Sequence, residues 1–342
     1  MSTRNRIALS FALVVVLGGG LAAVAAYLLG PPSALPSDGR LFDVIKGEST
    51  NSLAARLEGE GIIRSALAFS LTARIEGNAS KLRSGTYRIE PGMGGLAVLR
   101  LIVEGKEVLR KVTLPEGLTL KETAAVLAEN GIVEAEQFLA VADDSAVLST
   151  LGIPGTSAEG YLFPDTYFMP VNYGALKTLS ELVSTFRAKV ATIPEAKGLS
   201  ATALQDKLIL ASIIEKEYRI PEEAPLIASV FDNRLKIGMG LQSCATVVYV
   251  ITERLGKPHP DVVYDKDLAI HDPYNTYLHR GLPPSPIASP GLVALKAAFE
   301  PATSPFLYFR LVDPVVGTHH FSTNFDEHLK AAQLVLKRDH RP

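Results

Sequence analysis

The sequence predicts an α+β protein with a single N-terminal transmembrane helix, one or two small α/β modules and a larger mixed α+β domain. Three observations lead to this prediction. The first is an uncharged apolar run over residues 7–30. The second is a pair of similar strand–turn–helix patterns in the following part of the chain. The third is a change of composition near residue 159, after which long helical patterns give way to turn-rich segments.

The apolar run is long enough to cross a bilayer, since about 20 apolar residues suffice. Arg4 and Arg6 precede it, and the next charged residue after it is Asp38. Positive charge stays on the cytoplasmic side, so residues 1–6 should be inside and the body outside. A cleaved signal peptide is the alternative, because Ala23-Val24-Ala25 resembles a cleavage site, but the run is long for one.

Composition narrows the function classes. The net charge of −2 gives no electrostatic reason to expect a nucleic-acid partner. Cys244 is the single cysteine, so neither an internal disulfide nor a cysteine zinc cluster can form. The seven histidines are mostly late and scattered. We therefore expect no metal and no cofactor.

A linker and a first set of short elements follow the apolar run. Residues 31–40 are rich in Pro, Ser and Gly, which favours a linker. The patterns after it predict, in order, a strand from Phe42, a helix through Leu53 and Leu57 that stops at Gly61, a helix near 65–76, a strand over 85–90 and a helix over 95–104.

Part of this pattern returns 70 residues later. Ala54-Ala55, Leu57 and Gly61-Ile62-Ile63 match Ala124-Ala125, Leu127 and Gly131-Ile132-Val133. Each copy follows a strand and a turn that contains Gly. Two copies are too few for a solenoid, so small paired modules fit better.

The composition changes at Glu159–Tyr167, where aromatic residues, Pro and Asp are concentrated. Helical patterns follow near 173–192, 201–218 and 222–236, and turn-rich stretches come after them. Long irregular segments in a globular region are commonly functional.

The helix that ends near residue 218 is the most informative segment. It reads as amphipathic, because Leu210, Ile213 and Ile214 form an apolar stripe that runs to Glu217. A carboxyl group beside apolar side chains loses hydration, so its pKa rises and it can stay protonated near neutral pH. The alternative is a helix end whose acids face water.

Three later stretches combine aromatic and polar side chains with glycine or proline: Gly238–Ser243, Tyr274–Tyr277 with Gly281–Pro284, and His319–Asn324. Tyrosine rings can stack on sugars, while Asn, Thr and Gln can bind their hydroxyl and acetamido groups. Each stretch also has a structural explanation, since the prolines can stiffen a loop, the tyrosines can pack and His319 can cap a strand. Together they favour an extended cleft.

These segments resemble the membrane-anchored endolytic murein transglycosylases, the YceG-like family. The matching segments, in chain order, are Glu159–Tyr167, Ala211–Glu217, Val230–Leu235, Gly238–Gln242, Tyr274–Tyr277, Gly281–Pro284, Pro286–Ala288, and His319 with Phe321, Thr323 and Asn324. Each motif alone is weak, and the ordered set is specific.

The resemblance implies the site. The family's catalytic glutamate matches Glu217, and Glu215 reads as a supporting or solvated acid. The residues expected to bind glycan are Gln242, Tyr274, Asn275, Thr276, Tyr277, His319 and Asn324. The chain departs from the family pattern at Ser243-Cys244-Ala245-Thr246, where Thr-Asp-Pro-Thr is usual, and at Tyr218, where a small residue is common.

The resemblance also implies a reaction and partners. We expect a lytic transglycosylase that cleaves the bond between N-acetylmuramic acid and N-acetylglucosamine, leaves 1,6-anhydro ends and terminates glycan strand elongation. The expected partners are peptidoglycan glycan strands, the cell membrane and peptidoglycan synthases of the elongation machinery. The alternatives are a non-catalytic peptidoglycan-binding scaffold and a hydrolase that makes reducing ends.

The expected organisation joins these predictions. It places a cytoplasmic N-terminus at 1–6, the transmembrane helix at 7–30, the linker at 31–40, a LysM-like module at 41–107, a second strand–turn–helix module at 108–158 and the catalytic domain at 159–342. The LysM-like character is implied by the family. The protein would be a single-pass protein of the cytoplasmic membrane with its catalytic domain outside.

Overall fold

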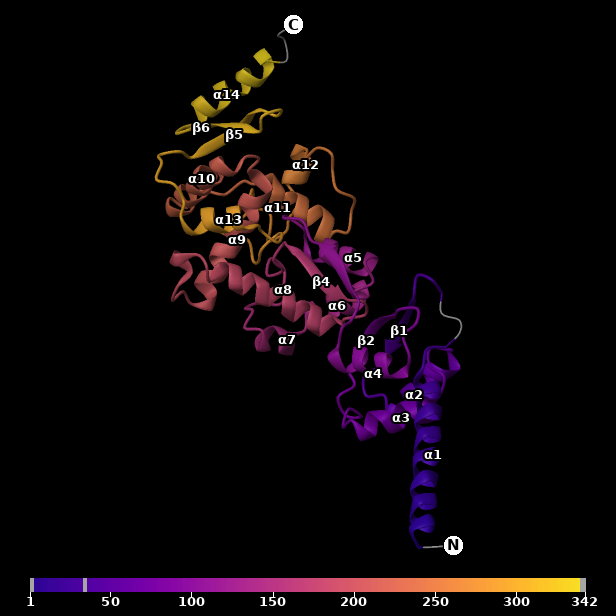
Figure 1. The fold of residues 1–342 in the computed structure, drawn as a ribbon. Coiled ribbons are helices and arrows are strands. Elements are labelled where there is room, and N and C mark those ends of the chain that lie inside the picture. The colour runs from indigo at the N-terminus through magenta and orange to yellow at the C-terminus, as the bar shows by residue number, and fades with distance from the viewer. Residues whose placement is uncertain (1–2, 33–35, 339–342) are drawn as a thin grey trace. The chain divides into compact units, whose positions relative to one another are not determined.

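The computed structural model describes residues 3–32 and 36–338, with side chains given for 16–32 and 36–331. The chain is divided into two compact units (Figure 1). The first unit comprises residues 1–110 and 170–172, and the second comprises residues 111–169 and 173–342. Each unit has its own hydrophobic core, and the mixed α+β class predicted from the sequence is confirmed.

The first unit packs short helices against a two-stranded antiparallel sheet. Its elements are α1 (Thr3–Leu29), β1 (Arg40–Val44), α2 (Thr50–Gly59), α3 (Ala66–Ile75), β2 (Gly85–Ile89) and α4 (Gly95–Glu104). β1 pairs with β2, with Phe42 opposite Tyr87. Both residues are buried with Leu53 and Leu57 of α2. The elements predicted over residues 42–104 are therefore confirmed.

Helix α1 contains all but the last residue of the segment predicted to cross the membrane, residues 7–30. In the described part of the chain, no helix has both the length and the apolar character needed to cross a membrane. The side chains of residues 7–15 lie outside those described. The transmembrane segment therefore stays a prediction.

The strand–turn–helix pattern has the same geometry in both copies. Helix α2 (Thr50–Gly59) corresponds to α5 (Leu120–Glu129) at the predicted offset. Both helices end before a glycine in the left-handed region, Gly61 at φ 69° and Gly131 at φ 66°. In both, an isoleucine amide then donates back into the helix end, from Ile62 to Leu57 and from Ile132 to Leu127. Only glycine adopts this conformation without strain, so the two glycines fix the same exit from both helices.

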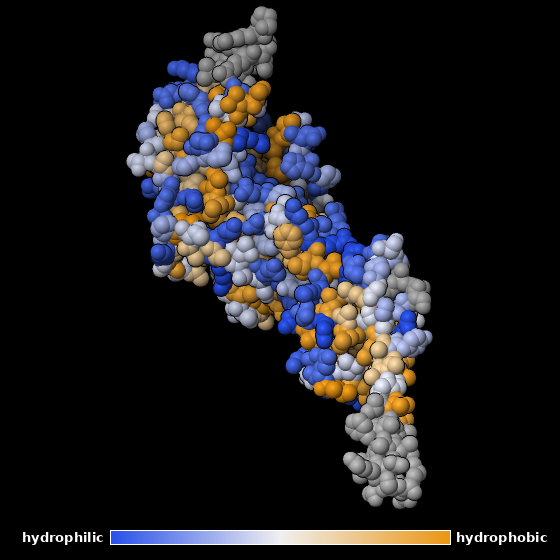
Figure 2. Space-filling model, viewed as in Figure 1, coloured by the Kyte–Doolittle hydropathy of each residue, from blue (hydrophilic) through white to orange (hydrophobic). Residues whose placement is uncertain are grey.

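The second unit is mostly helical, with two small sheets. Its strands pair as β3 (Leu109–Thr113) with β4 (Thr166–Pro170) and β5 (Tyr308–Asp313) with β6 (Thr318–Ser322). Its α-helices are α5, α6 (Ala135–Ala142), α7 (Ser145–Thr150), α8 (Ala175–Val190), α9 (Ala201–Glu217), α10 (Ala224–Lys236), α11 (Cys244–Tyr249), α12 (Asp265–Leu268), α13 (Leu292–Phe299) and α14 (Phe325–Arg338). Three short turns complete the unit: Pro194–Ala196 and Pro221–Glu223 are 3₁₀, and Val250–Arg254 is π-helical. On the face shown in Figure 2, hydrophilic and hydrophobic side chains are interspersed over this unit.

Helix α9 lies at the centre of this unit and packs against α10, α11 and α13 (Figure 1). Ser200 caps its first turn by accepting a hydrogen bond from the Ala203 amide. Every residue from Leu208 to Ile214 is buried. The helix predicted near 201–218 is confirmed, but its predicted amphipathic character is wrong, because segments distant in sequence cover all of its faces over these two turns. Polar Ser212 is accommodated because its hydroxyl donates to the Ile209 carbonyl and accepts from the Ile287 amide.

Candidate active site

Glu217 is the last residue of α9, and the residue is half-buried. Burial by the surrounding protein raises the pKa of this carboxyl, while the Ser243 hydroxyl and the nearby His319, Arg219 and Arg234 lower it. The helix C-terminus carries partial negative charge, which also disfavours the ionised form. A group balanced in this way can both hold and release a proton.

The Ser243 hydroxyl donates a hydrogen bond of 2.6 Å to Glu217 Oε1. Ser243 is fixed by its loop, since its amide donates to the Thr276 hydroxyl at 3.0 Å and its carbonyl accepts from Thr246 at 2.8 Å. The preceding Gln242 has φ 51°, a left-handed conformation that turns the chain toward α9. The donor to Glu217 is therefore positioned by buried loop contacts.

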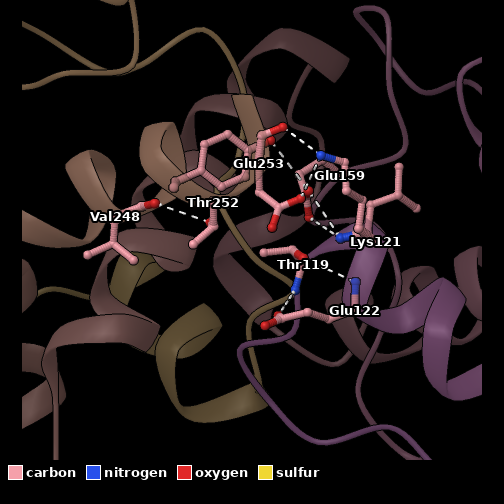
Figure 3. Close-up of polar contacts among 9 residues, drawn as sticks. Thr119, Lys121, Glu122, Glu159, Val248, Thr252 and Glu253 are labelled. Atoms are coloured by element: carbon pink, nitrogen blue, oxygen red, sulfur yellow. Dashed lines mark hydrogen bonds and ion pairs between the residues drawn. The ribbon is translucent and has the colours of Figure 1, made fainter. Parts of the chain in front are cut away.

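A cavity of about 520 Å³ includes Glu217 in its lining. Charged and polar side chains form much of its wall, among them Thr119, Glu122, Lys216, Arg219, Thr252, Glu253, Lys257 and His259, and the remaining lining is Cys244, Ala245, Val248, Tyr249 and Ile287. We call it the charged cavity. Figure 3 shows part of this wall, where residues of α5 meet the π-helical turn.

A second cavity of about 320 Å³ also includes Glu217. Aromatic side chains dominate it: Phe231, Tyr277, Tyr308, Phe309 and Phe325. The remaining lining consists of Arg234, Leu241, Gln242, Ser243, Cys244 and His328. We call it the aromatic cavity. Glu217 thus borders two cavities of different character, which suits a long substrate that reaches beyond the acid.

Glu215 points to a different environment. It accepts a hydrogen bond of 2.9 Å from the Gly291 amide, and it lines neither the charged nor the aromatic cavity. Burial raises its pKa to about 7, while the Gly291 amide lowers it. Glu215 is therefore a supporting acid that ties α9 to the start of α13, and not a solvated one.

Two of the seven residues predicted to bind glycan line a cavity. Gln242 and Tyr277 both border the aromatic cavity, and the Tyr277 hydroxyl lies 3.1 Å from Cys244 Sγ. The structure therefore brings them together with Glu217.

The Tyr274–Thr276 segment instead holds the loops beneath the site. The side-chain amide of Asn275 donates to the carbonyls of Leu268 and Ile270, and Asn275 is fully buried. The Thr276 hydroxyl accepts from the Ser243 amide. The Tyr274 hydroxyl pairs with Ser285 at 2.6 Å. These side chains act on the site through other residues in this structure.

The two late predictions lie on β6 and at the start of α14. His319 Nδ1 lies 2.7 Å from Glu223 Oε2, and the His319 side chain is only 4% exposed. Asn324 accepts a hydrogen bond from the Glu327 amide and so caps α14. His319 affects Glu217 by its charge, while Asn324 has a local structural contact.

Several residues of the site were not predicted. Ser243 belongs to the Gly238–Ser243 stretch and departs from the family pattern, but no sequence signal indicated that it contacts the acid. Arg219, Lys257 and Tyr308 lie in no matched segment, so only the folded chain reveals them. Arg234 lies in the matched Val230–Leu235 segment, which could have pointed to it. Among the described residues, no group of three or more His, Cys, Asp or Glu is arranged to hold a metal ion.

Glu159, in the first matched segment, is buried away from this chemistry. Both of its carboxyl oxygens accept from the Leu120 amide, at 3.0 and 3.1 Å, at the first residue of α5. Burial raises its pKa to about 8. Its contacts indicate that the segment secures the wall that carries Thr119 and Glu122 (Figure 3).

Comparison with known proteins places the chain in a family. The model of the YceG-like family matches residues 42–334. An endolytic murein transglycosylase of Bacillus subtilis (strain 168) is 31% identical over 311 residues, which cover 86% of this chain and 84% of the relative. One of Streptococcus pneumoniae serotype 2 (strain D39 / NCTC 7466) is 28% identical over 313 residues, 83% of this chain but 56% of that longer relative.

A solved structure agrees with these matches. The crystal structure of a yceG-like protein of Listeria monocytogenes has a TM-score of 0.57 and 30% sequence identity, and the match covers 86% of this chain and 99% of that one. The residues matched by the family model include those that build the Glu217 site. The chain therefore belongs to the YceG-like family.

Proposed function

We propose that this protein is a lytic transglycosylase that cleaves the bond between N-acetylmuramic acid and N-acetylglucosamine within peptidoglycan strands. The observation that carries the proposal is the position of Glu217. Its desolvated carboxyl group borders two cavities and accepts a hydrogen bond from the Ser243 hydroxyl. The relatives named as endolytic murein transglycosylases support the same reaction. A substrate that fills both cavities would be cut inside the strand.

In the first half of the reaction, Glu217 acts as the general acid. Its protonated carboxyl donates to the glycosidic oxygen, the C1–O4 bond breaks, and the substrate's own acetamido group meets the positive charge at C1. Oε1 accepts from Ser243, and no described residue is hydrogen-bonded to Oε2. Oε2 is therefore the oxygen from which the proton would leave.

In the second half, the ionised Glu217 acts as the general base. It takes the proton of the muramoyl C6 hydroxyl, whose oxygen bonds to C1 and closes the 1,6-anhydro ring. Glu217 is protonated again, and no water is consumed. Because the nucleophile belongs to the substrate, its orientation in the cavity supplies much of the rate.

A single acid is enough for this route, whereas most hydrolytic glycosidases use two. The other carboxyl groups of the charged cavity have structural partners. Glu122 accepts from the Thr119 amide at 2.8 Å, and Glu253 pairs with Lys121. These contacts favour the transglycosylase over a hydrolase.

The decisive experiment is digestion of purified peptidoglycan with identification of the products by mass. The wild-type protein should release 1,6-anhydro ends. Glu217→Gln keeps the size of the side chain but removes the transferable proton, so it should fold, bind glycan and lose at least about 10²-fold in rate. Glu215→Gln should lose much less.

Other outcomes have distinct meanings. Reducing ends would indicate a hydrolase, and binding without any product would indicate a non-catalytic scaffold. A dead Glu215→Gln beside a near-normal Glu217→Gln would move the catalytic role to Glu215. Near-normal activity in both variants would refute the single-acid mechanism.

The proposal extends to where the enzyme works. Residues 7–30 would anchor it in the cytoplasmic membrane, residues 41–107 would form a LysM-like module that binds glycan or sets the distance to the membrane, and the body would act outside. Cutting nascent strands there would end their elongation beside the peptidoglycan synthases. The apolar run and its Arg4/Arg6 flank support the anchor.

A further inference from the structure

The two cavities that border Glu217 differ in the state of their charged groups. In the charged cavity the negative side chains are already engaged. Glu122 closes a capping box with Thr119 at the start of α5. Lys121 lies 3.4 Å from the Glu253 carboxyl and also donates to the Glu253 carbonyl (Figure 3).

The positive side chains of the same cavity are not all engaged. Lys216 donates to the Gly117 carbonyl at 2.7 Å. Arg219 and Lys257 are exposed, and over residues 36–331 neither side chain has a hydrogen-bond or ion-pair partner. The charged cavity therefore presents two available cations beside a wall of satisfied acids.

Both cations are placed to meet a substrate at the acid. Arg219 follows Glu217 by two residues and is close enough to lower the pKa of its carboxyl. Lys257 also lines a neighbouring cavity of about 390 Å³, whose wall includes Tyr264, Lys266 and two acids, Asp261 and Asp267. A group bound by both cations would share the charged cavity with Glu217, and the neighbouring cavity at Lys257 gives room for a substituent on that group.

In the aromatic cavity, the arginine side chain is already paired with groups of the protein. This arginine, Arg234, donates to the carbonyls of Leu307 at 2.7 Å and Leu241 at 2.6 Å. The Arg234 guanidinium also lies 5.1 Å from the centre of the Tyr308 ring. This cation is already used by the protein, so the aromatic cavity suits uncharged sugar faces.

We propose that Arg219 and Lys257 bind a carboxylate carried on the lactyl side chain of the muramoyl residue. The muramoyl sugar then occupies the charged cavity, and the N-acetylglucosamine that is the leaving group lies in the aromatic cavity. The carboxylate belongs either to the lactyl group itself or to a peptide attached to it. The inference rests on the proposed function, and it fixes the direction in which a strand lies across Glu217.

The test compares three substrates with the full-length protein. They are glycan strands with their peptides, peptide-free strands with a free lactyl carboxylate, and peptide-free strands whose lactyl carboxyl is converted to a neutral methylamide. Formation of 1,6-anhydro ends is measured as kcat/KM for wild type, Arg219→Gln and Lys257→Gln. Lys236→Gln is the matched control, because Lys236 lies in neither cavity and pairs with Asp232.

A charge-assisted hydrogen bond is worth about a tenfold change in rate or more. Wild type should therefore cleave an anionic substrate at least about tenfold better than the neutral strands. In Arg219→Gln and Lys257→Gln the ratio of kcat/KM on anionic strands to kcat/KM on neutral strands should fall to about one, and cleavage of the neutral strands shows that the variants fold. Lys236→Gln should follow wild type throughout.

The pattern across substrates identifies the source of the carboxylate. In strands that carry peptides, the lactyl carboxyl is taken up in the amide bond to the peptide. A loss confined to the peptide-free anionic strands therefore points to the lactyl carboxylate, and a loss confined to peptide-bearing strands points to a peptide carboxylate. A loss on both shows that the two cations accept a carboxylate from either position. Equal losses on all three substrates, or no loss on any, would overturn the inference and leave the proposed function intact. If wild type gives no anhydro product with any substrate, the proposed function itself fails, and the inference with it.

Discussion

At the scale of single residues, the proposed chemistry depends on opposing influences on one carboxyl group. Burial raises the pKa of Glu217, and the Ser243 hydroxyl lowers it. A general acid works best when its pKa is near the working pH, since it must hold the proton in one step and remove one in the next. Ser243 therefore has a direct part in setting the pH range, although the family pattern has a different residue there.

Ser243→Ala should move the pH dependence of the reaction upward. The hydrogen bond of 2.6 Å stabilises the ionised form of Glu217, so its loss raises the pKa of the free enzyme's acid. The limb of kcat/KM that falls at high pH should shift to higher pH by about one unit, because such a bond is worth about 1.5 kcal/mol. The measurement is the pH profile of anhydro-product formation.

The control for this change is Ser180→Ala on α8, whose hydroxyl donates only to the Leu176 carbonyl. It should keep the wild-type profile. An unchanged limb in Ser243→Ala, or a shift to lower pH, would contradict the role given to this hydroxyl.

At the scale of elements, the same strand–turn–helix arrangement occurs twice in the chain. A strand, a capped helix and a left-handed glycine recur in α2 and α5 at the same offset. The signals are local, since the N-cap, the apolar positions and the glycine all act within a few residues. In α9 the decisive contacts are long-range, because the burial of Leu208–Ile214 depends on helices that lie later in the chain.

Gly59 at the end of α2 and Gly61 just after it give a matched test of the left-handed backbone conformation that ends this helix. Gly61 has φ 69°, whereas Gly59 is helical, and neither would bring an added Cβ within 4 Å of other atoms. Gly61→Ala should lower the free energy of unfolding by about 1 kcal/mol, since only backbone strain is introduced. Gly59→Ala should raise it by up to about 1 kcal/mol.

Urea unfolding of both variants gives the comparison. Equal effects of the two substitutions would mean that the conformation at Gly61 is not what fixes the helix end.

At the scale of the whole molecule, the proposal joins an anchor, a small module and a catalytic unit in one chain. Because the first unit is folded around its own core, its contribution can be tested apart from the chemistry. The second unit contains every residue that lines the two cavities at Glu217.

The anchor predicts where the mature protein is found. Residues 7–30 should remain on it, and it should stay with the membrane fraction until detergent is added. N-terminal sequencing and fractionation check this. A mature protein that begins near Ala26 and washes off without detergent would show that the segment is a signal peptide.

The small module predicts a change in substrate engagement. A variant that lacks residues 41–107 but keeps the anchor should bind sacculi less well or cleave them more slowly, because glycan contacts or the distance to the membrane are lost. Binding and anhydro-product formation are measured side by side with the full chain. If both are unchanged, residues 41–107 are a spacer without a functional role.

The sequence by itself determined the features whose causes are local. Short-range patterns place the helices, the strands and the repeated glycine turns, and the order of the motifs singles out Glu217. It did not reveal that α9 is buried on all sides, that Ser243 donates to an acid 26 residues earlier, or that Asn275, Thr276 and His319 hold other groups. Those facts depend on which distant segments pack together, and a side chain's partner is decided only when those segments meet. The sequence also did not reveal that the side chains of Arg219 and Lys257 are unpaired among the described residues, because whether a cation is paired depends on the acids that the fold brings beside it.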